Sequence, residues 1–150
     1  NSKIRFIIVG DGALKKIYQK KYGHLKNLIF APKVTKNQVQ SVLSYADVVY
    51  FSVYKSKVWD YGQSLNKVID YMISKKPILA SYSGYPSMIN ESNCGFFVPA
   101  EEVMSLVSKI KELALMSESE RNTIGAKGRS WLIENRTYKK LANDYLNLLF

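Results

Sequence analysis

The sequence has a single cysteine, a single histidine and no long apolar run. A lone Cys94 cannot build an intramolecular disulfide framework, and together with the lone His24 it excludes zinc sites made of several cysteines and histidines. No apolar run approaches the roughly 20 residues that a membrane-spanning helix needs. The first residues, Asn1 to Lys3, do not resemble a secretory signal. We therefore expect a cytoplasmic protein without a metal site.

Positive charge is abundant and unevenly distributed. The chain has 22 Lys and Arg against 12 Asp and Glu, a net charge of +10. Residues 1–80 hold 14 basic and 4 acidic residues, whereas residues 81–150 hold 8 of each. A basic surface can attract nucleic acid, an anionic membrane or phosphorylated small molecules, so the sign of the charge does not choose among these partners.

Short apolar segments alternate with helical patterns along the chain. With 150 residues, 47% of them hydrophobic, a single α/β domain is expected. The predicted strands are 5–10, 27–30, 47–53, 78–81 and 95–98, and the predicted helices are 13–22, a helix capped by Thr35 and reaching Ala46, then 64–72, 86–91, 101–116, 119–134 and 138–149. This order predicts a Rossmann-like, doubly wound parallel sheet with flanking helices. The strand 47–53 is almost continuously apolar, which predicts a strand covered on both faces.

Ligands of such sheets bind beyond the carboxyl ends of the strands. The loops expected at that edge are 10–12, 31–34, 52–66 and 81–85, and they are rich in glycine, serine and lysine. The first of them, Gly10-Asp11-Gly12, begins like a dinucleotide fingerprint but lacks its third glycine. A tight strand-to-helix turn explains it equally well. Either way, the turn can bring its backbone close to a diphosphate.

The most informative stretch is 61–72, Tyr-Gly-Gln-Ser-Leu-Asn-Lys-Val-Ile-Asp-Tyr-Met, followed by the apolar segment 76–80. Backbone N–H groups at a helix start, from Ser64 to Lys67, can donate to phosphate oxygens, and Lys67 adds a positive charge. Asp70 can accept hydrogen bonds from sugar hydroxyls. The structural alternative makes Ser64 an N-cap, Asn66 a turn residue and Lys67 a surface lysine.

Other conspicuous residues have simpler explanations. His24 is expected on the surface because nothing near it pairs with it, and Cys94 is expected to be a small buried apolar residue. The tyrosines 45, 50, 54 and 61 are expected to pack in the core and at its rim rather than to stack on bases.

Several segments, taken in order, resemble the C-terminal, donor-binding domain of the retaining glycosyltransferases of the two-Rossmann-domain (GT-B) fold, the family called glycosyl transferases group 1. The matching segments are 7–12, 27–34, 45–48, 61–72, 76–78 and 93–98. The resemblance implies a nucleotide-sugar donor site at Gly10, Gly12, Lys33, Val34, Gly62, Ser64, Asn66, Lys67 and Asp70. It implies no metal or other cofactor, because the nucleotide sugar is a substrate.

The family uses two glutamates eight positions apart. Asp70 matches the second, which binds the ribose, whereas Gly62 stands where the first would be. Lys33 and Val34 match a loop that touches the nucleobase. Lys67 matches the diphosphate-facing helix start, where it would act in catalysis by stabilising the leaving group.

The resemblance also implies the protein's role. Residues 1–150 correspond to the donor domain without its first strand-helix unit and without the N-terminal acceptor domain, so the chain is expected not to transfer sugar alone. A UDP-sugar is favoured over a GDP-sugar as donor. The expected process is the synthesis of a bacterial-type surface polysaccharide, with an acceptor sugar or lipid-linked sugar held by the missing domain and peripheral contact with the inner face of the membrane.

Two other classes of function stay open at this point. One is a non-enzymatic flavodoxin-like or receiver-like module that binds a nucleotide or a protein, although Val53-Tyr54 stands where a receiver has its phosphorylated aspartate. The other is nucleic-acid binding by the basic residues, which would be steeply salt-dependent and for which the sequence contains no recognised reading motif.

Overall fold

The computed structural model describes residues 4–63 and 65–149. The chain divides into two compact units, Asn1–Val39 (unit 1) and Gln40–Phe150 (unit 2). Its strands form one sheet in each unit, with the orders β1-β2 and β3-β4-β5. The described strands thus form two sheets rather than the single sheet expected, and every strand pair is parallel, as predicted.

Unit 1 is a short βαβ element. Strand β1 (Phe6–Val9) leads through a glycine turn to helix α1 (Lys15–Tyr22) and strand β2 (Leu28–Ala31). The two strands pair in register from Phe6 opposite Leu28 to Val9 opposite Ala31. After β2, Thr35 caps the 3-10 turn η1 (Lys36–Gln38), and its backbone N–H donates to the Gln38 side chain at 3.0 Å. These elements confirm the predicted strands, helix and cap.

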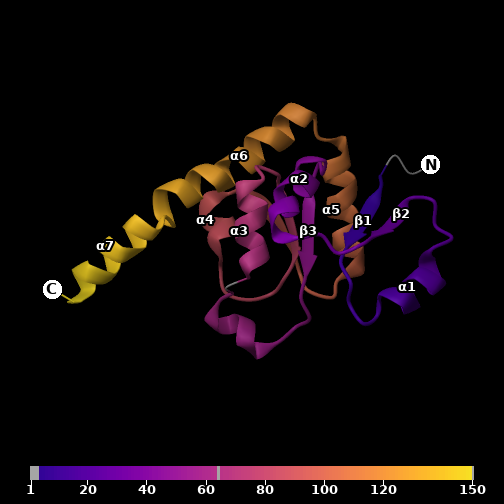
Figure 1. The fold of residues 1–150 in the computed structure, drawn as a ribbon, viewed down its shortest axis with the longest axis horizontal. Helices are drawn as coiled ribbons and strands as arrows, with labels where there is room; N and C mark the ends of the chain where they lie inside the picture. Colours follow the sequence, from indigo (N-terminus) through magenta and orange to yellow (C-terminus); the bar gives the residue numbers. More distant parts are fainter. Residues whose placement is uncertain (1–3, 64, 150) are drawn as a thin grey trace. The chain divides into compact units, whose positions relative to one another are not determined.

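The remaining elements belong to unit 2, except that α2 begins at Val39, the last residue of unit 1, and they follow the predicted order. They are α2 (Val39–Ser44), β3 (Val49–Ser52), the 3-10 helix η2 (Lys57–Tyr61), α3 (Asn66–Ile73), β4 (Ile78–Ser81), α4 (Met88–Ser92), β5 (Gly95–Val98), α5 (Val103–Leu115), α6 (Glu118–Asn135) and α7 (Tyr138–Leu149). Helix α6 runs beside α3 and leads into α7, which lies at the C-terminal end (Figure 1). None of the helices in the described ranges is long and apolar enough to cross a bilayer.

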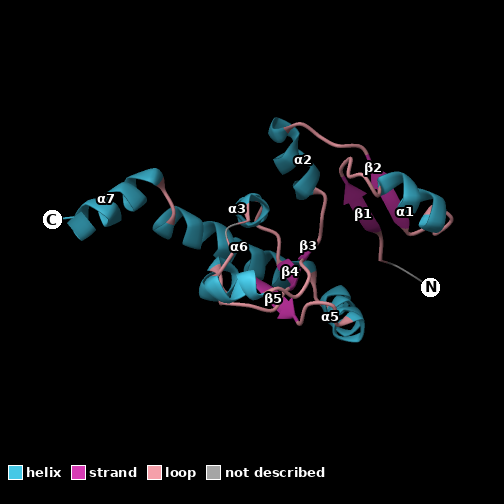
Figure 2. Ribbon diagram, turned by 90° about the horizontal axis from the view of Figure 1, so that it is seen from below, coloured by secondary structure: helices cyan, strands magenta, loops and turns pink. Residues whose placement is uncertain are grey.

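The sheet of unit 2 is covered by helices on both faces. In Figure 2, α3 and α6 lie on one side of the β3-β4-β5 sheet and α5 on the other. Alternating residues of β4 explain this arrangement: Ile78 and Ala80 belong to the core that contains Val68 of α3, whereas Leu79 packs with Leu113 of α5. The doubly wound arrangement predicted from the sequence thus applies to unit 2.

Strand β3 departs from its prediction. Val49 and Phe51 are each 4% exposed, but Tyr50 is 42% exposed and Ser52 is also exposed. The strand is at the edge of its sheet and buries only one face, so its continuous apolar run does not signal burial on both faces.

Close helix packing fixes α3. A Cβ atom at Gly125 of α6 would lie 2.1 Å from the carbonyl oxygen of Lys75, and one at Gly128 would lie 3.0 Å from the Sγ of Cys94. Lys75 itself has a left-handed φ of 58° in the turn after α3. Gly125 therefore allows α6 to approach the backbone of the turn after α3, and Gly128 leaves room for the side chains of Cys94 and of Met72 in α3.

Candidate functional site

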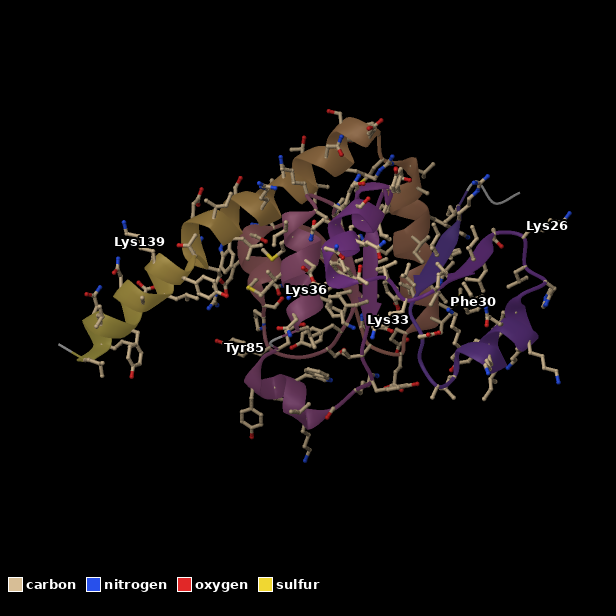
Figure 3. All side chains as sticks on the ribbon, in the orientation of Figure 1. Lys26, Phe30, Lys33, Lys36, Tyr85 and Lys139 are labelled. Atoms are coloured by element: carbon tan, nitrogen blue, oxygen red, sulfur yellow. The ribbon has the colours of Figure 1, made fainter. Side chains whose placement is uncertain are left out.

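The segment between β3 and α3 is held in place by Trp59. The Trp59 indole N–H donates to the carbonyl of Tyr54 at 3.0 Å, and its ring meets that of Tyr82 edge-on at 5.9 Å between centroids. The backbone N–H of Tyr85, labelled in Figure 3, donates to the Trp59 carbonyl at 2.9 Å. A Cβ atom at Gly84 would lie 2.6 Å from the Cβ of Trp59. The polar segment predicted from the sequence is thus an ordered turn around η2 that delivers the chain to α3.

Gly62 is a position that only glycine suits. It ends η2 with φ 102° and ψ −178°, and its N–H donates to the Trp59 carbonyl at 3.2 Å. This combination of dihedral angles is essentially restricted to glycine. A glutamate in this conformation would strain the backbone, so the first glutamate of the family motif does not fit this turn as it is built here.

Helix α3 begins at Asn66, two residues later than the predicted range of 64–72. Leu65 occupies the N-cap position in an extended conformation, without a side-chain cap, and Ser64 lies outside the described residues. Asn66 and Lys67 are exposed in the first turn, and the N–H of Val68 donates to the Leu65 carbonyl at 2.9 Å. The N–H groups that precede Val68 have no acceptor within the helix, because no turn comes before them. The helix therefore presents donors and a lysine at one end.

Asp70 lies one turn further along α3. The residue is half-buried, whereas Val68 and Met72 of the same helix are buried in the core. Its carbonyl accepts a hydrogen bond from the Gln40 side-chain amide at 3.0 Å, which fixes the backbone here. Burial, and secondarily the negative charge of Asp70, raise the pKa of the neighbouring Tyr71, whose hydroxyl donates to the backbone at 3.1 Å. The backbone that carries Asp70 is thus bonded to the Gln40 side chain.

Lys67 and Asp70 are three residues apart, a spacing that brings side chains to one side of a helix. Within the described ranges, no ion pair of 4 Å or less involves either of them. By contrast, Asp47 is bridged to Arg121 at 3.3 Å. A cation and an anion that do not neutralise each other remain available to a ligand that carries both phosphates and hydroxyls.

Gln63 is a residue that the sequence did not single out. Both polar atoms of its side-chain amide are buried, and neither has a hydrogen-bond partner among the described residues. Buried amides are normally hydrogen-bonded. This one lies between Gly62 and the start of α3, so it is a further candidate for contact with a ligand.

Two clefts open at the carboxyl edge of the unit 2 sheet. One, of about 270 Å³, is lined by Tyr50, Ser52, Val53, Tyr54, Ser81, Glu101, Glu102, Val103 and Leu106. The other, of about 410 Å³, is lined by Lys55, Ser56, Lys57, Asp60 and Ser83. Neither is lined by Gly62, Asn66, Lys67 or Asp70, which lie just before α3 or on it. Phosphate recognition by a helix start depends on exposed N–H donors rather than on a deep cavity.

The glycines of unit 1 differ from each other. Gly10 has φ 149°, so the turn itself needs a glycine there. At Gly12 no positive φ is found, and an added Cβ would meet nothing within 4 Å. The described structure therefore does not require a glycine at position 12, and the open space beside it is available to a ligand.

Lys15 is a second residue that the sequence did not single out. Its ammonium donates to the carbonyls of Gly10 at 2.7 Å and Ala31 at 2.8 Å, and lies 3.6 Å from the Asp11 carboxylate. It thereby ties the ends of β1 and β2 together. The segment after β2 carries the predicted Lys33, which is exposed, and Val34, which is half-buried. Lys15 therefore positions the turn and the loop that were predicted to meet the nucleotide.

The structure also tests the predictions for the lone histidine, the lone cysteine and the tyrosines. His24 is exposed and Cys94 is fully buried, as expected, and burial raises the pKa of the Cys94 thiol. The prediction of core and rim packing is wrong for Tyr45, Tyr54 and Tyr61, which are 87%, 81% and 91% exposed. Each lies outside the strands: Tyr45 directly follows α2, Tyr54 follows β3, and Tyr61 is the last residue of η2.

Comparisons with solved structures agree on the fold. Sucrose-phosphate synthase from Thermosynechococcus elongatus is similar with a TM-score of 0.74 and 17% identity, over 95% of this chain and 37% of that one. TarM is similar with a TM-score of 0.75 and 23% identity, over 99% of this chain and 29% of TarM. Anabaena HepE, solved in complex with UDP-glucose, is similar with a TM-score of 0.73 and 15% identity, over 99% of this chain and 41% of HepE. The chain thus spans well under half the length of each. No curated protein sequence matches it significantly.

The match to a sequence profile identifies the family of this chain. The profile described as Glycosyl transferases group 1 matches residues 1–115, which include the glycine turn, the loop after β2 and the start of α3. The predicted α/β, Rossmann-like architecture and the resemblance to GT-B glycosyltransferases are both confirmed. This chain belongs to the family of glycosyl transferases group 1.

Proposed function

We propose that this chain binds the nucleotide-sugar donor of a retaining glycosyltransferase, with a UDP-sugar as that donor. The observation that carries the proposal is the start of α3, where exposed N–H donors, Lys67 and Asp70 occur together without an ion pair between them. Family membership supports transfer of a sugar, and the HepE complex with UDP-glucose supports uridine as the base.

Each residue has a role in this proposal. The N–H groups of Asn66 and Lys67 and the Lys67 ammonium hold the diphosphate, and Asp70 accepts hydrogen bonds from the ribose hydroxyls. Lys67 and the helix start then stabilise the negative charge that develops on the diphosphate as it leaves the sugar. A bound metal or other cofactor is not part of the proposal.

In this proposal, residues of unit 1 also contact the donor. Gly10 and Gly12 let the backbone turn and leave space for the ligand, and the loop with Lys33 and Val34 meets the base. We further propose that the donor sugar goes to an acceptor sugar or lipid-linked sugar held by a domain outside this chain, in the synthesis of a bacterial-type surface polysaccharide at the cytoplasmic face of a membrane. On this account residues 1–150 are a donor-binding domain and need the acceptor domain for turnover.

Calorimetric titration tests the proposal. Wild type should bind UDP more tightly than GDP or CMP. Lys67→Met should weaken UDP binding about tenfold or more, as expected for a hydrogen bond to a charged group, while leaving uridine binding almost unchanged. Asp70→Asn should weaken both ligands, because both carry the ribose.

Matched controls separate the site from net charge. Lys111→Met and Glu134→Gln remove the same charges from exposed positions in α5 and α6. Both should bind UDP like wild type. Failure of a folded sample to bind UDP, or equal losses in the site variants and the controls, would contradict the proposed function.

A further inference from the structure

Positive charge is concentrated in unit 1. Residues 1–39 hold nine Lys and Arg and one acidic residue, whereas residues 40–150 hold 13 and 11. Residues 12–46 contain seven lysines and no aspartate or glutamate. Most of the net charge of +10 therefore belongs to the smaller unit, which makes unit 1 a strongly cationic module.

Helix α1 carries this charge beside exposed apolar side chains. Lys16, Lys20 and Lys21 are exposed, and Ile17 is 59% exposed. Because residues three and four apart are neighbours on a helix, Ile17 lies next to both Lys20 and Lys21. Leu14, 53% exposed, continues this surface toward the start of the helix. We name these five residues the α1 patch.

The lysines of the patch are not neutralised within the described structure. The acidic residue of unit 1, Asp11, is 3.6 Å from Lys15. Within the described ranges, no carboxylate lies within 4 Å of the ammonium groups of Lys16, Lys20 or Lys21. Lys26, labelled in Figure 3, adds a further exposed charge in the segment after α1. The patch can therefore pair with anions of a partner.

The combination of charge and apolar side chains selects among anionic partners. A nucleic acid would pair with the lysines but would leave Ile17 and Leu14 in water. An anionic bilayer satisfies both, because basic side chains meet the headgroups while apolar ones enter the boundary with the acyl chains. We propose that the α1 patch docks unit 1 onto the surface of an anionic lipid membrane. The residues involved are separate from those of the proposed donor site.

The expected strength follows from the number of lysines. Each lysine near an anionic surface contributes about fivefold to the partition coefficient, so removing three should reduce binding about a hundredfold. The attraction should also weaken steeply with salt, since the Debye length falls from about 8 Å at physiological ionic strength to about 3 Å at 1 M.

Co-sedimentation of the full chain with vesicles tests the proposal. Vesicles of phosphatidylcholine alone are compared with vesicles that also contain phosphatidylglycerol. The variant Lys16→Gln/Lys20→Gln/Lys21→Gln is compared with Lys111→Gln/Lys127→Gln/Arg129→Gln, which removes the same charge from exposed positions of unit 2. We expect binding only to the anionic vesicles, lost about a hundredfold in the first variant and retained within a few-fold in the second.

A second variant distinguishes lipid from nucleic acid. Ile17→Ser should weaken vesicle binding about tenfold, because it removes an inserting apolar side chain, and should leave any binding to duplex DNA unchanged. UDP affinity, measured on the same samples, reports on the donor site independently. Absence of binding to anionic vesicles, equal losses in the two triple variants, or tighter binding to DNA than to vesicles at equal salt would overturn the proposal.

Discussion

Replacing Gly12 by alanine should weaken ligand binding without lowering the stability of the fold. An added Cβ at this position meets no atom within 4 Å, and the backbone is not in the positive-φ region. The variant should therefore fold at least as well as wild type, with a free energy of unfolding unchanged or raised by about 0.4–1 kcal/mol through a less flexible unfolded chain. If a diphosphate passes close to this backbone, the methyl group displaces it, and UDP should bind about tenfold more weakly, or about 1.4 kcal/mol.

Urea denaturation and calorimetric titration with UDP measure the two quantities on one sample. Gly10→Ala is the matched control, because its φ of 149° is strained for alanine and should lower the free energy of unfolding by about 1–3 kcal/mol. A loss of stability in Gly12→Ala as large as in Gly10→Ala would contradict the open geometry of the turn. Unchanged stability together with wild-type UDP affinity would refute the inference that the ligand approaches Gly12.

Three further predictions concern residues that pack or form hydrogen bonds within a single unit, Lys15 in unit 1 and Gly125 and Cys94 in unit 2. Gly125→Ala should lower the free energy of unfolding by about 1–3 kcal/mol in urea titrations, because its Cβ would lie 2.1 Å from the Lys75 carbonyl oxygen; an unchanged midpoint would contradict the close packing of α6. Lys15→Met should speed hydrogen exchange at the Gly10 amide, which bonds to Ala31, since the ammonium that joins the two strand ends is lost; exchange at the wild-type rate would show that Lys15 is dispensable. Cys94 should resist thiol reagents at neutral pH until the protein unfolds, because burial raises its pKa. Because the thiol pKa is higher in the folded protein than in the unfolded chain, the thiol contributes stability below its unfolded pKa, and this stability is lost as the pH rises through its folded pKa. The Cys94→Ala variant lacks the thiol, so its free energy of unfolding should fall less at alkaline pH than that of wild type.

Local patterns predicted the elements well. Strands β4 (Ile78–Ser81) and β5 (Gly95–Val98) and helix α7 (Tyr138–Leu149) have the predicted bounds. Each is marked by its own apolar run or helical period and by flanking turn residues. Such signals depend on neighbours in sequence, which a single sequence contains.

Long-range features were not predictable in the same way. Which strands pair depends on contacts between distant segments, and here they form two sheets rather than one. The φ of Gly62 is set by the turn around Trp59, and the bonds of Lys15 depend on one conformation among many of a long side chain. The exposure of Tyr61 follows from its place in η2. None of these leaves a signature in residue type alone.

The sequence predicted which residues at the start of α3 could bind a ligand, but it did not predict the residue at which the helix begins. The sequence predicts roles for Lys67 and Asp70 because a helix start binds phosphate and a carboxylate binds ribose, and in the described ranges neither residue has an ion-pair partner. The cap was misplaced by one residue, because Leu65 is a poor N-cap by type and only the backbone conformation identifies it. The proposed roles of these residues stay predictions.

The most direct measurement of the central claim is a nuclear magnetic resonance titration of the isotope-labelled chain with UDP. The account predicts that the amide signals of Asn66 and Lys67, at the start of α3, and of Gly12 shift most. Uridine should move the signals of Asp70 and its neighbours while affecting Asn66 and Lys67 less. Shifts confined to other parts of the chain, or no shifts in a folded sample, would contradict the assignment of this helix start as the donor-binding site.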